Sequence, residues 1–273
     1  MTRSTFKPAR LVGLLRCLAT LASLYIGVAV VAVETLTVEV HRKLPHDPEA
    51  YTQGLVWWQG RLYESTGRRG RSQLRKIDPG TGIVEHRVSI PLMFFGEGLA
   101  RVDQRLVMLT WQAEQAFVFA VDGFARVGKL DYRGEGWGLC HDGTRFVMSD
   151  GSDRLSFRDS ESFALVGTVS VTLEGRPLTN LNELECVDDK IYANVFQHDV
   201  IVRVDPATGR VGARIDASGL LDDGESRGAD VLNGIAYAPE LDRFYVTGKL
   251  WPAMFEVTFV GGSDQATADL STP

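Results

Sequence analysis

The sequence predicts an all-β fold, a five-bladed β-propeller, and three observations predict it. A short tripeptide, polar or containing glycine, leads into an apolar strand five times, at intervals of roughly 40 to 50 residues, the length of one four-stranded blade. Each copy is followed by further short strands bounded by turn residues. No segment shows a sustained 3.6-residue periodicity, so helices should be few and short. The copies are Gln53-Gly54-Leu55, Glu97-Gly98-Leu99, Trp137-Gly138-Leu139, Asn182-Glu183-Leu184 and Asn233-Gly234-Ile235.

The later strands of each repeat can also be recognised in the sequence. The second strands end in small hydroxylated or amide residues, as expected where a hairpin leaves a crowded channel. These residues are Ser65, Thr110, Ser149, Asn194 and Thr247. Third strands are expected at 74–78, 117–121, 155–159, 201–205 and 254–257. Outer strands follow some of them, for example at 84–90 and 211–215.

The fifth repeat lacks an outer strand after Val257, and residues 261–273 form a polar tail. A spare strand, Leu36 to Val40, lies at the start of the predicted catalytic domain, which covers residues 33–260. We expect this strand to complete the fifth blade, because that would close the ring and cover the free sheet edges.

Residues 1–32 are predicted to be a signal peptide. They combine a basic start with an uncharged apolar run from Cys17 to Val33, and Val30-Val31-Ala32 offers small residues for cleavage. The run is about as long as the shortest membrane span, so an uncleaved anchor is the alternative. The leader predicts an exported protein, either periplasmic or secreted.

The chain is acidic. Its formal net charge is −6, and the leader holds four basic residues and no acidic ones, so the remainder is more acidic still. An acidic surface of this kind lacks the excess of positive charge that binds nucleic acid or anionic lipid. We therefore expect no nucleic-acid partner, no stable membrane association once the leader is cleaved, and a monomer with a single domain.

The cysteines and histidines give little support for cross-links or metals. Cys140 and Cys186 follow the first positions of neighbouring repeats, and export would permit a disulfide. Blades diverge outward, however, and the two residues are one position out of register, which argues against pairing. No CxxC, HxH or HExxH spacing occurs, so neither a metal nor another cofactor is expected.

Equivalent positions of the blades should meet around one central channel. Gln53, Glu97, Trp137, Asn182 and Asn233 would then form a ring. Glu97 is its only carboxylate. Apolar neighbours at Phe94, Phe95 and Leu99 should raise its pKa. One carboxylate, three amides and an indole suit a catalytic site for a small polar substrate.

The five repeats resemble those of the plant-type glutaminyl cyclases, a family also found in bacteria. The resemblance runs from about His46 to Val257. Its strings are Tyr51-Thr52-Gln53-Gly54-Leu55, Phe95-Gly96-Glu97-Gly98-Leu99, Gly134-Glu135-Gly136-Trp137-Gly138-Leu139, Leu181-Asn182-Glu183-Leu184-Glu185 and Val231-Leu232-Asn233-Gly234-Ile235-Ala236. It implies a five-bladed propeller that acts as a glutaminyl-peptide cyclotransferase without a metal. Such an enzyme converts the N-terminal glutamine of peptides or proteins to pyroglutamate and releases ammonia.

The resemblance also implies roles for individual residues. Glu97 matches the family's acid–base carboxylate, and the other matches surround it. They are Gln53, Trp137, Asn182 and Lys249 as pocket residues, with Tyr51 and Phe95 as aromatic walls. Phe196 stands where the plant proteins usually have Trp, so the wall remains but the indole N–H is lost. Trp111 is either pocket rim or packing, and Asn233 either binds substrate or forms a turn.

The chemistry of cyclisation fits these residues. The attacking amine is tethered to its target, so proton transfer is the main task, and one carboxyl group can carry it out. Lys249, Asn182, Trp137 and Gln53 are candidate donors to the oxyanion. Among the other acidic residues, Glu135 and Glu185 are expected to face solvent or pair with Arg. Glu183 is interpreted as a partner for an Arg or Lys of a neighbouring repeat.

Two alternatives differ in class. A non-catalytic propeller could bind a peptide with the same ring of amides and aromatics, although such a module has no need of Glu97 beside Lys249. A propeller lactonase or lyase would hold a metal with several carboxylates or histidines. The single carboxylate of the ring argues against that second alternative.

Overall fold

The structure is a computed structural model that describes residues 1–2 and 32–261. Residues 32–261 are all-β, and no helix occurs among them. The described part therefore contains no helix that could cross a membrane. The predicted signal peptide and the polar tail beyond Gly261 lie outside the described residues.

Three sheets consist of four antiparallel strands each, in chain order. The first contains β2 (Thr52–Trp58), β3 (Arg61–Thr66), β4 (Gln73–Ile77) and β5 (Val84–Ser89). The second contains β6 (Gly96–Val102), β7 (Arg105–Thr110), β8 (Gln115–Ala120) and β9 (Arg126–Asp131). The third contains β10 (Leu139–His141), β11 (Arg145–Ser149), β12 (Arg154–Asp159) and β13 (Leu165–Ser170). A small hairpin that the sequence pattern did not predict, β14 (Thr172–Leu173) with β15 (Arg176–Pro177), follows.

The remaining strands form one eight-stranded sheet, in which two four-strand groups meet at the N-terminal strand. One group contains β16 (Leu181–Val187), β17 (Lys190–Val195), β18 (Val200–Val204) and β19 (Val211–Asp216). The other contains β20 (Leu232–Ala238), β21 (Arg243–Gly248), β22 (Ala253–Gly261) and β1 (Glu34–Pro45). As expected for the spare strand, β1 pairs antiparallel with β22. It also pairs in parallel with β19, which the sequence did not predict.

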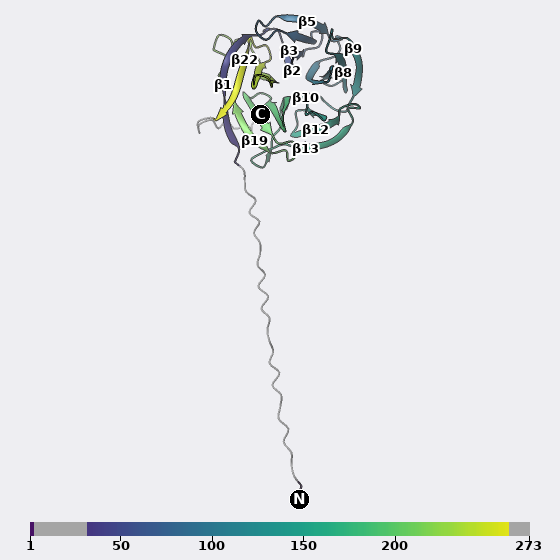
Figure 1. Cartoon of the computed structure of the whole chain (residues 1–273), viewed down its shortest axis with the longest axis vertical. Coiled ribbons are helices and arrows are strands. Elements are labelled where there is room, and N and C mark those ends of the chain that lie inside the picture. Colours follow the sequence, from purple (N-terminus) through teal and green to yellow (C-terminus); the bar gives the residue numbers. More distant parts are fainter. Residues whose placement is uncertain (3–31, 262–273) are drawn as a thin grey trace. The chain divides into compact units, whose positions relative to one another are not determined.

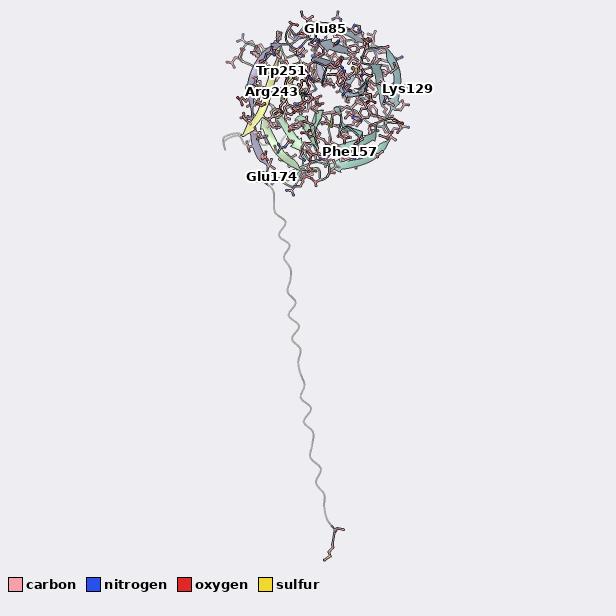
Figure 2. All side chains as sticks on the ribbon, in the orientation of Figure 1. Glu85, Lys129, Phe157, Glu174, Arg243 and Trp251 are labelled. Atoms are coloured by element: carbon pink, nitrogen blue, oxygen red, sulfur yellow. A yellow bond between two sulfur atoms is a disulfide. The ribbon has the colours of Figure 1, made fainter. Side chains whose placement is uncertain are left out.

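The sheets are arranged around a common centre in a propeller-like way, with β5, β9, β13 and β1 on the circumference (Figure 1). Burial follows this arrangement. The first strand of the second sheet, β6, is buried over five of its residues, whereas its last strand, β9, is largely exposed. Figure 2 shows Glu85 of β5 and Lys129 of β9 on the outer edge. The apolar core lies between neighbouring sheets, where both faces of the inner strands are covered.

The repeated glycine is explained by contact between first strands. A Cβ on Gly54 would overlap the main-chain nitrogen of Leu99, and one on Gly98 would overlap the main chain of Trp137 to Leu139. A Cβ on Gly138 would likewise overlap the carbonyl of Asn182. Only glycine allows backbones to approach this closely. The residue before each glycine is thereby brought to the centre.

The small polar residues at the ends of the second strands link neighbouring sheets. The Ser65 hydroxyl donates to the carbonyl of Glu97, at 2.6 Å. The Ser149 hydroxyl donates to the carbonyl of Asn182, at 2.7 Å. The side-chain oxygen of Asn194 accepts a hydrogen bond from the backbone N–H of Gly234, at 2.9 Å. These bonds fix the tip of one sheet against the next and so hold the site residues in place.

Cys140 and Cys186 form a disulfide, with their Cα atoms 5.5 Å apart. The sequence-based argument against pairing is therefore wrong. It relied on the outward divergence of blades, but both residues lie on first strands, β10 and β16, which contact each other near the centre. Close to the centre the two strands approach each other closely enough for the cysteines to bond, although their positions in the repeat differ by one residue.

We expect the double variant C140S/C186S to fold with a lower melting temperature. The bridge closes a loop of 46 residues, for which loop-closure entropy in the unfolded chain corresponds to roughly 2–4 kcal/mol. Calorimetry of the oxidised protein and of the variant would measure the difference. An unchanged melting temperature would contradict a stabilising role for the bridge.

Candidate active site

A cavity of about 290 Å³ opens where the first strands converge. Its lining contains nine of the ten residues selected from the sequence. They are Tyr51, Gln53, Phe95, Glu97, Trp111, Trp137, Asn182, Phe196 and Lys249. The tenth, Asn233, is fully buried and is not part of the lining. These residues come from four sheets or from the loops between their strands, so only the closed arrangement brings them together.

Glu97 lies on β6 with only 4% of its surface exposed. Burial raises the pKa of its carboxyl group well above the usual range, whereas the nearby Lys249 ammonium and a hydrogen bond from Gln53 lower it. Burial is the larger effect, because removing a carboxylate from water penalises its charged form. A carboxyl group with a raised pKa accepts a proton more readily than an exposed glutamate, which suits Glu97 to acid–base catalysis.

Asn233 holds the side chain of Gln53. Its Nδ2 donates to the Oε1 of Gln53, at 3.2 Å, and to the carbonyl of Thr52, at 3.0 Å. With its oxygen engaged, the Gln53 amide presents its N–H groups to Glu97. Asn233 therefore contacts the site through Gln53 and not through the cavity.

Lys249 is 3% exposed and follows β21. Its ammonium lies 5.1 Å from the ring centre of Tyr51 and 4.8 Å from that of Phe196. Burial lowers the pKa of Lys249, while Glu97 and Asp230 raise it. The next residue, Leu250, has a φ of 61°, an unfavourable conformation for a non-glycine residue of the kind that tends to occur at functional sites.

Two groups of aromatic rings wall the cavity. Tyr51 meets Phe95 edge to face with ring centres 6.1 Å apart, and Phe95 meets Trp111 at 5.7 Å. On the other side Trp137 and Phe196 form a perpendicular pair at 5.7 Å. Flat apolar walls of this kind suit a planar amide or a five-membered ring.

Three comparisons with known proteins agree. The family described as glutamine cyclotransferase matches residues 12–259. The glutaminyl-peptide cyclotransferase of Arabidopsis thaliana is 38% identical over 226 residues, which cover 81% of this chain and 70% of the relative. The crystal structure of Myxococcus xanthus glutaminyl cyclase superposes with a TM-score of 0.77 and 38% identity, covering 85% of this chain and 100% of that one. The chain belongs to the glutamine cyclotransferase family.

The sequence did not predict the contacts of Glu135, a partly exposed residue beside the cavity. Glu135 was expected to face solvent or to pair with Arg. Its Oε2 instead accepts the indole N–H of Trp111, at 2.7 Å, and that of Trp137, at 3.0 Å. Its Oε1 accepts from Gln112, at 2.9 Å. Because Glu135 occupies the indole N–H of Trp137, that group is not available to an oxyanion, and Trp137 acts as a wall.

We expect Glu135→Gln to lower kcat/KM by roughly 10- to 100-fold, the range for hydrogen bonds to a charged group. A neutral amide has one acceptor oxygen, so its nitrogen would face an indole N–H and the two rings would lose their common anchor. Steady-state kinetics would measure the loss, with the exposed Glu161→Gln as control. Wild-type kinetics in Glu135→Gln would show that the rings need no such anchor.

Glu183 was also interpreted wrongly from the sequence, whereas Glu185 is partly exposed, as expected. Glu183 occupies the position that is glycine in other repeats, and it is fully buried. It pairs with no Arg or Lys among residues 32–261; its oxygens accept the backbone N–H groups of Leu55, at 3.2 Å, and Ile235, at 2.7 Å. Glu185 accepts the N–H of Tyr237, and burial raises its pKa to about 8. Neither lines the cavity, and Glu183 links three first strands.

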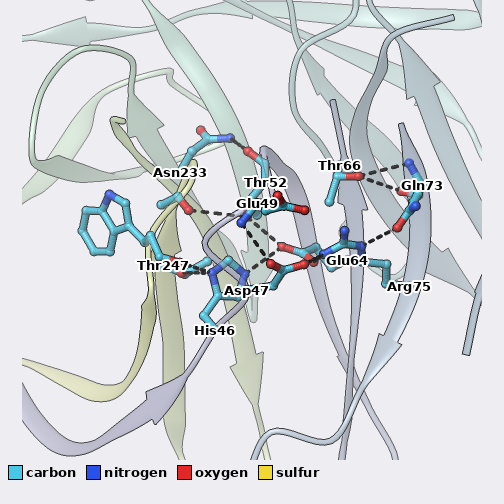
Figure 3. Close-up of polar contacts among 12 residues, drawn as sticks. His46, Asp47, Glu49, Thr52, Glu64, Thr66, Gln73, Arg75, Asn233 and Thr247 are labelled. Carbon is cyan, nitrogen blue, oxygen red and sulfur yellow. Dashed lines mark hydrogen bonds and ion pairs between the residues drawn. The ribbon is translucent and has the colours of Figure 1, made fainter. Parts of the chain in front are cut away.

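A buried network supports the segment before β2 (Figure 3). His46 contacts Glu64 through Nε2, at 2.9 Å, and the Trp251 carbonyl through Nδ1, at 2.8 Å. The Thr52 hydroxyl also donates to Glu64, at 2.7 Å. Burial alone would lower the pKa of His46, but Glu64 raises it. The network connects the segment carrying Gln53 to the segment that follows Lys249.

Potential metal ligands are dispersed in the described part of the chain. Residues 1–2 and 32–261 contain no group of three or more His, Cys, Asp or Glu side chains that could hold a metal ion. Within the cavity lining, Glu97 alone carries a carboxylate.

Proposed function

We propose that the protein is an exported glutaminyl-peptide cyclotransferase with Glu97 as its acid–base group. The observation that carries the proposal is the buried Glu97 beside Lys249 in an aromatic cavity sized for one glutaminyl residue. Membership of the glutamine cyclotransferase family supports the same activity.

The reaction breaks one C–N bond and forms another. The α-amino nitrogen of the substrate attacks the side-chain amide carbon, and its proton passes to the carboxylate of Glu97. The tetrahedral intermediate carries an oxyanion, which the Lys249 ammonium stabilises. Glu97 then returns the proton to the departing nitrogen, the C–N bond breaks, and ammonia and the pyroglutamyl product leave.

Asn182 completes the binding of the glutaminyl group. Its Oδ1 is buried and has no hydrogen-bond partner among the described residues, although the side chain lines the cavity. A buried acceptor without a partner is costly, and a substrate N–H would remove that cost. Asn182 therefore orients the substrate, while Gln53 holds Glu97.

The fold behind this site is proposed to have five four-stranded blades. In this interpretation the eight-stranded sheet consists of two blades, which β1 joins by its parallel pairing with β19. Five first strands, each carrying one copy of the tripeptide, then surround the centre. Export to the periplasm or the exterior is supported by the leader composition and by the Cys140–Cys186 disulfide, which needs an oxidising compartment.

The test is incubation of the purified protein with dipeptides that begin with Gln, with and without a strong chelator. We expect ammonia release in equal amounts in both, because the proposed steps use Glu97 and Lys249 and no Lewis acid. No ammonia release from any Gln peptide would overturn the proposed activity. Loss of activity with EDTA, restored by one divalent ion, would instead favour a metal-dependent propeller enzyme.

A further inference from the structure

Two arginines on the loop between β3 and β4 pack on aromatic rings that line the cavity. Arg68 places its guanidinium carbon 4.6 Å from the ring centre of Tyr51. Arg69 places its own 5.7 Å from the ring centre of Trp111. Tyr51 and Trp111 both line the cavity, so each cation packs on a ring of the cavity wall. The rings between them form a continuous wall through Phe95.

Neither arginine has an ion-pair partner within residues 32–261. Arg69 makes one long hydrogen bond, 3.4 Å to the Oε1 of Gln112, and Arg68 makes no recorded side-chain hydrogen bond there. Arg61 of the same sheet, in contrast, pairs with Glu85 and Asp78. Guanidinium groups that stack on aromatic rings keep their N–H donors free for a planar, bidentate acceptor.

The acidic groups at this rim are engaged elsewhere. Glu135 already accepts hydrogen bonds from two indoles and from Gln112. Asp230 accepts the N–H of Val231 and hydrogen-bonds the hydroxyl group of Tyr51. Among the described residues neither carboxylate forms an ion pair with Arg68 or Arg69, so most of their guanidinium N–H groups are left for an acceptor outside the protein.

The loop backbone holds the two cations in place. Arg68 has a φ of 79°, the left-handed conformation that is costly for a residue with a Cβ. Its carbonyl accepts the N–H of Arg71 and the hydroxyl of Ser72, both at 2.9 Å. Gly67, just before it, packs so closely on Phe95 that a Cβ there would overlap the ring. The loop is thus fixed against the aromatic wall, where Arg68 stacks on Tyr51.

We infer that Arg68 and Arg69 form a subsite for a carboxylate of the substrate, located one or two residues after the N-terminal glutamine. This inference rests on the proposed function. An extended peptide advances about 3.3–3.6 Å per residue, so in this inference the one or two residues after the glutamine span the distance from the cavity to the arginines. The carboxylate has two sources, an acidic side chain at the second or third position, or the C-terminal carboxylate of a short peptide.

The test compares peptides that differ only in this charge. Gln-Ala-Ala-amide is the neutral reference, Gln-Glu-Ala-amide and Gln-Ala-Glu-amide carry an acidic side chain, and Gln-Lys-Ala-amide carries a basic one. Gln-Ala and Gln-Ala-amide isolate the terminal carboxylate. We expect kcat/KM for the preferred acidic substrate to exceed the reference by about fivefold, through a lower KM, which corresponds to one exposed ion pair. The preference should shrink at high salt.

Variants of the two arginines test whether these residues cause the preference for acidic substrates. In Arg68→Gln/Arg69→Gln the preference for acidic substrates should disappear, while kcat on the neutral reference stays the same. Arg87→Gln is the matched control, because Arg87 is exposed on β5 and makes no recorded ion pair. In the single variant Arg69→Glu, Gln-Lys-Ala-amide should become a better substrate than Gln-Glu-Ala-amide.

Two outcomes overturn the inference without touching the proposed function. One is equal kcat/KM for acidic, neutral and basic peptides in the wild type. The other is an acidic preference that survives in the double variant. Failure to cyclise any of the peptides, in contrast, would overturn the proposed function itself.

Discussion

Glu97→Gln should fold normally and lose nearly all cyclisation activity. The amide is isosteric with the carboxyl group but cannot exchange a proton, and general acid–base catalysis contributes roughly 10²–10⁴-fold. Burial raises the pKa of Glu97 well above its usual range, so the wild-type carboxylate accepts a proton more readily than an exposed glutamate does. The rate of ammonia release at a saturating concentration of a Gln dipeptide would give kcat.

The control for this variant is Glu161→Gln, an exposed glutamate whose side chain makes no recorded contact. A circular-dichroism melting curve like that of the wild type would show that Glu97→Gln keeps the fold. If that variant processed Gln peptides at nearly the wild-type rate, another group would have to carry the proton.

Lys249→Met should lower kcat by roughly 10²-fold or more and raise KM less. The ammonium is buried beside Glu97, and a fixed charge acts most strongly on charge that appears in the transition state. Methionine is unbranched like lysine and one heavy atom shorter, and it removes the ammonium that faces Tyr51 and Phe196. Should kcat stay intact while KM rises, Lys249 would be a positioning residue.

The pH profile of the same variant gives a second readout. Lys249 lowers the pKa of Glu97, so its removal leaves that pKa higher still. The carboxylate form would then be populated only at higher pH, and the acid limb of kcat/KM should move upward in Lys249→Met. An unmoved acid limb would mean that the two side chains do not interact electrostatically in the site.

Much of the cavity could be predicted because its residues occupy equivalent positions in a repeat. Once the repeat is recognised, symmetry brings Gln53, Glu97, Trp137 and Asn182 together. The glycine beside most of them marks a close approach of backbones, which is a local property that a sequence displays. The ends of the second strands and the pairing of β1 with β22 follow from the same periodicity.

What could not be predicted depends on contacts between sheets. Glu135 anchors Trp111, which lies 24 residues before it and comes from another sheet. Glu183 has the sequence context of a surface acid, yet its neighbours in space are backbone N–H groups 128 and 52 residues away. The pairing of Cys140 with Cys186 depends on how closely two first strands approach, which no pattern of residue types records.

The double pairing of β1 has a consequence for how the chain reaches its folded state. β1 is among the first segments to be synthesised, yet both of its partners, β19 and β22, lie near the other end of the chain. Contacts this distant in sequence form slowly, because the intervening loop must be closed first. The edge of β1 therefore stays unpaired until β19 and β22 have been synthesised. β1 would be the first strand made and the last one placed.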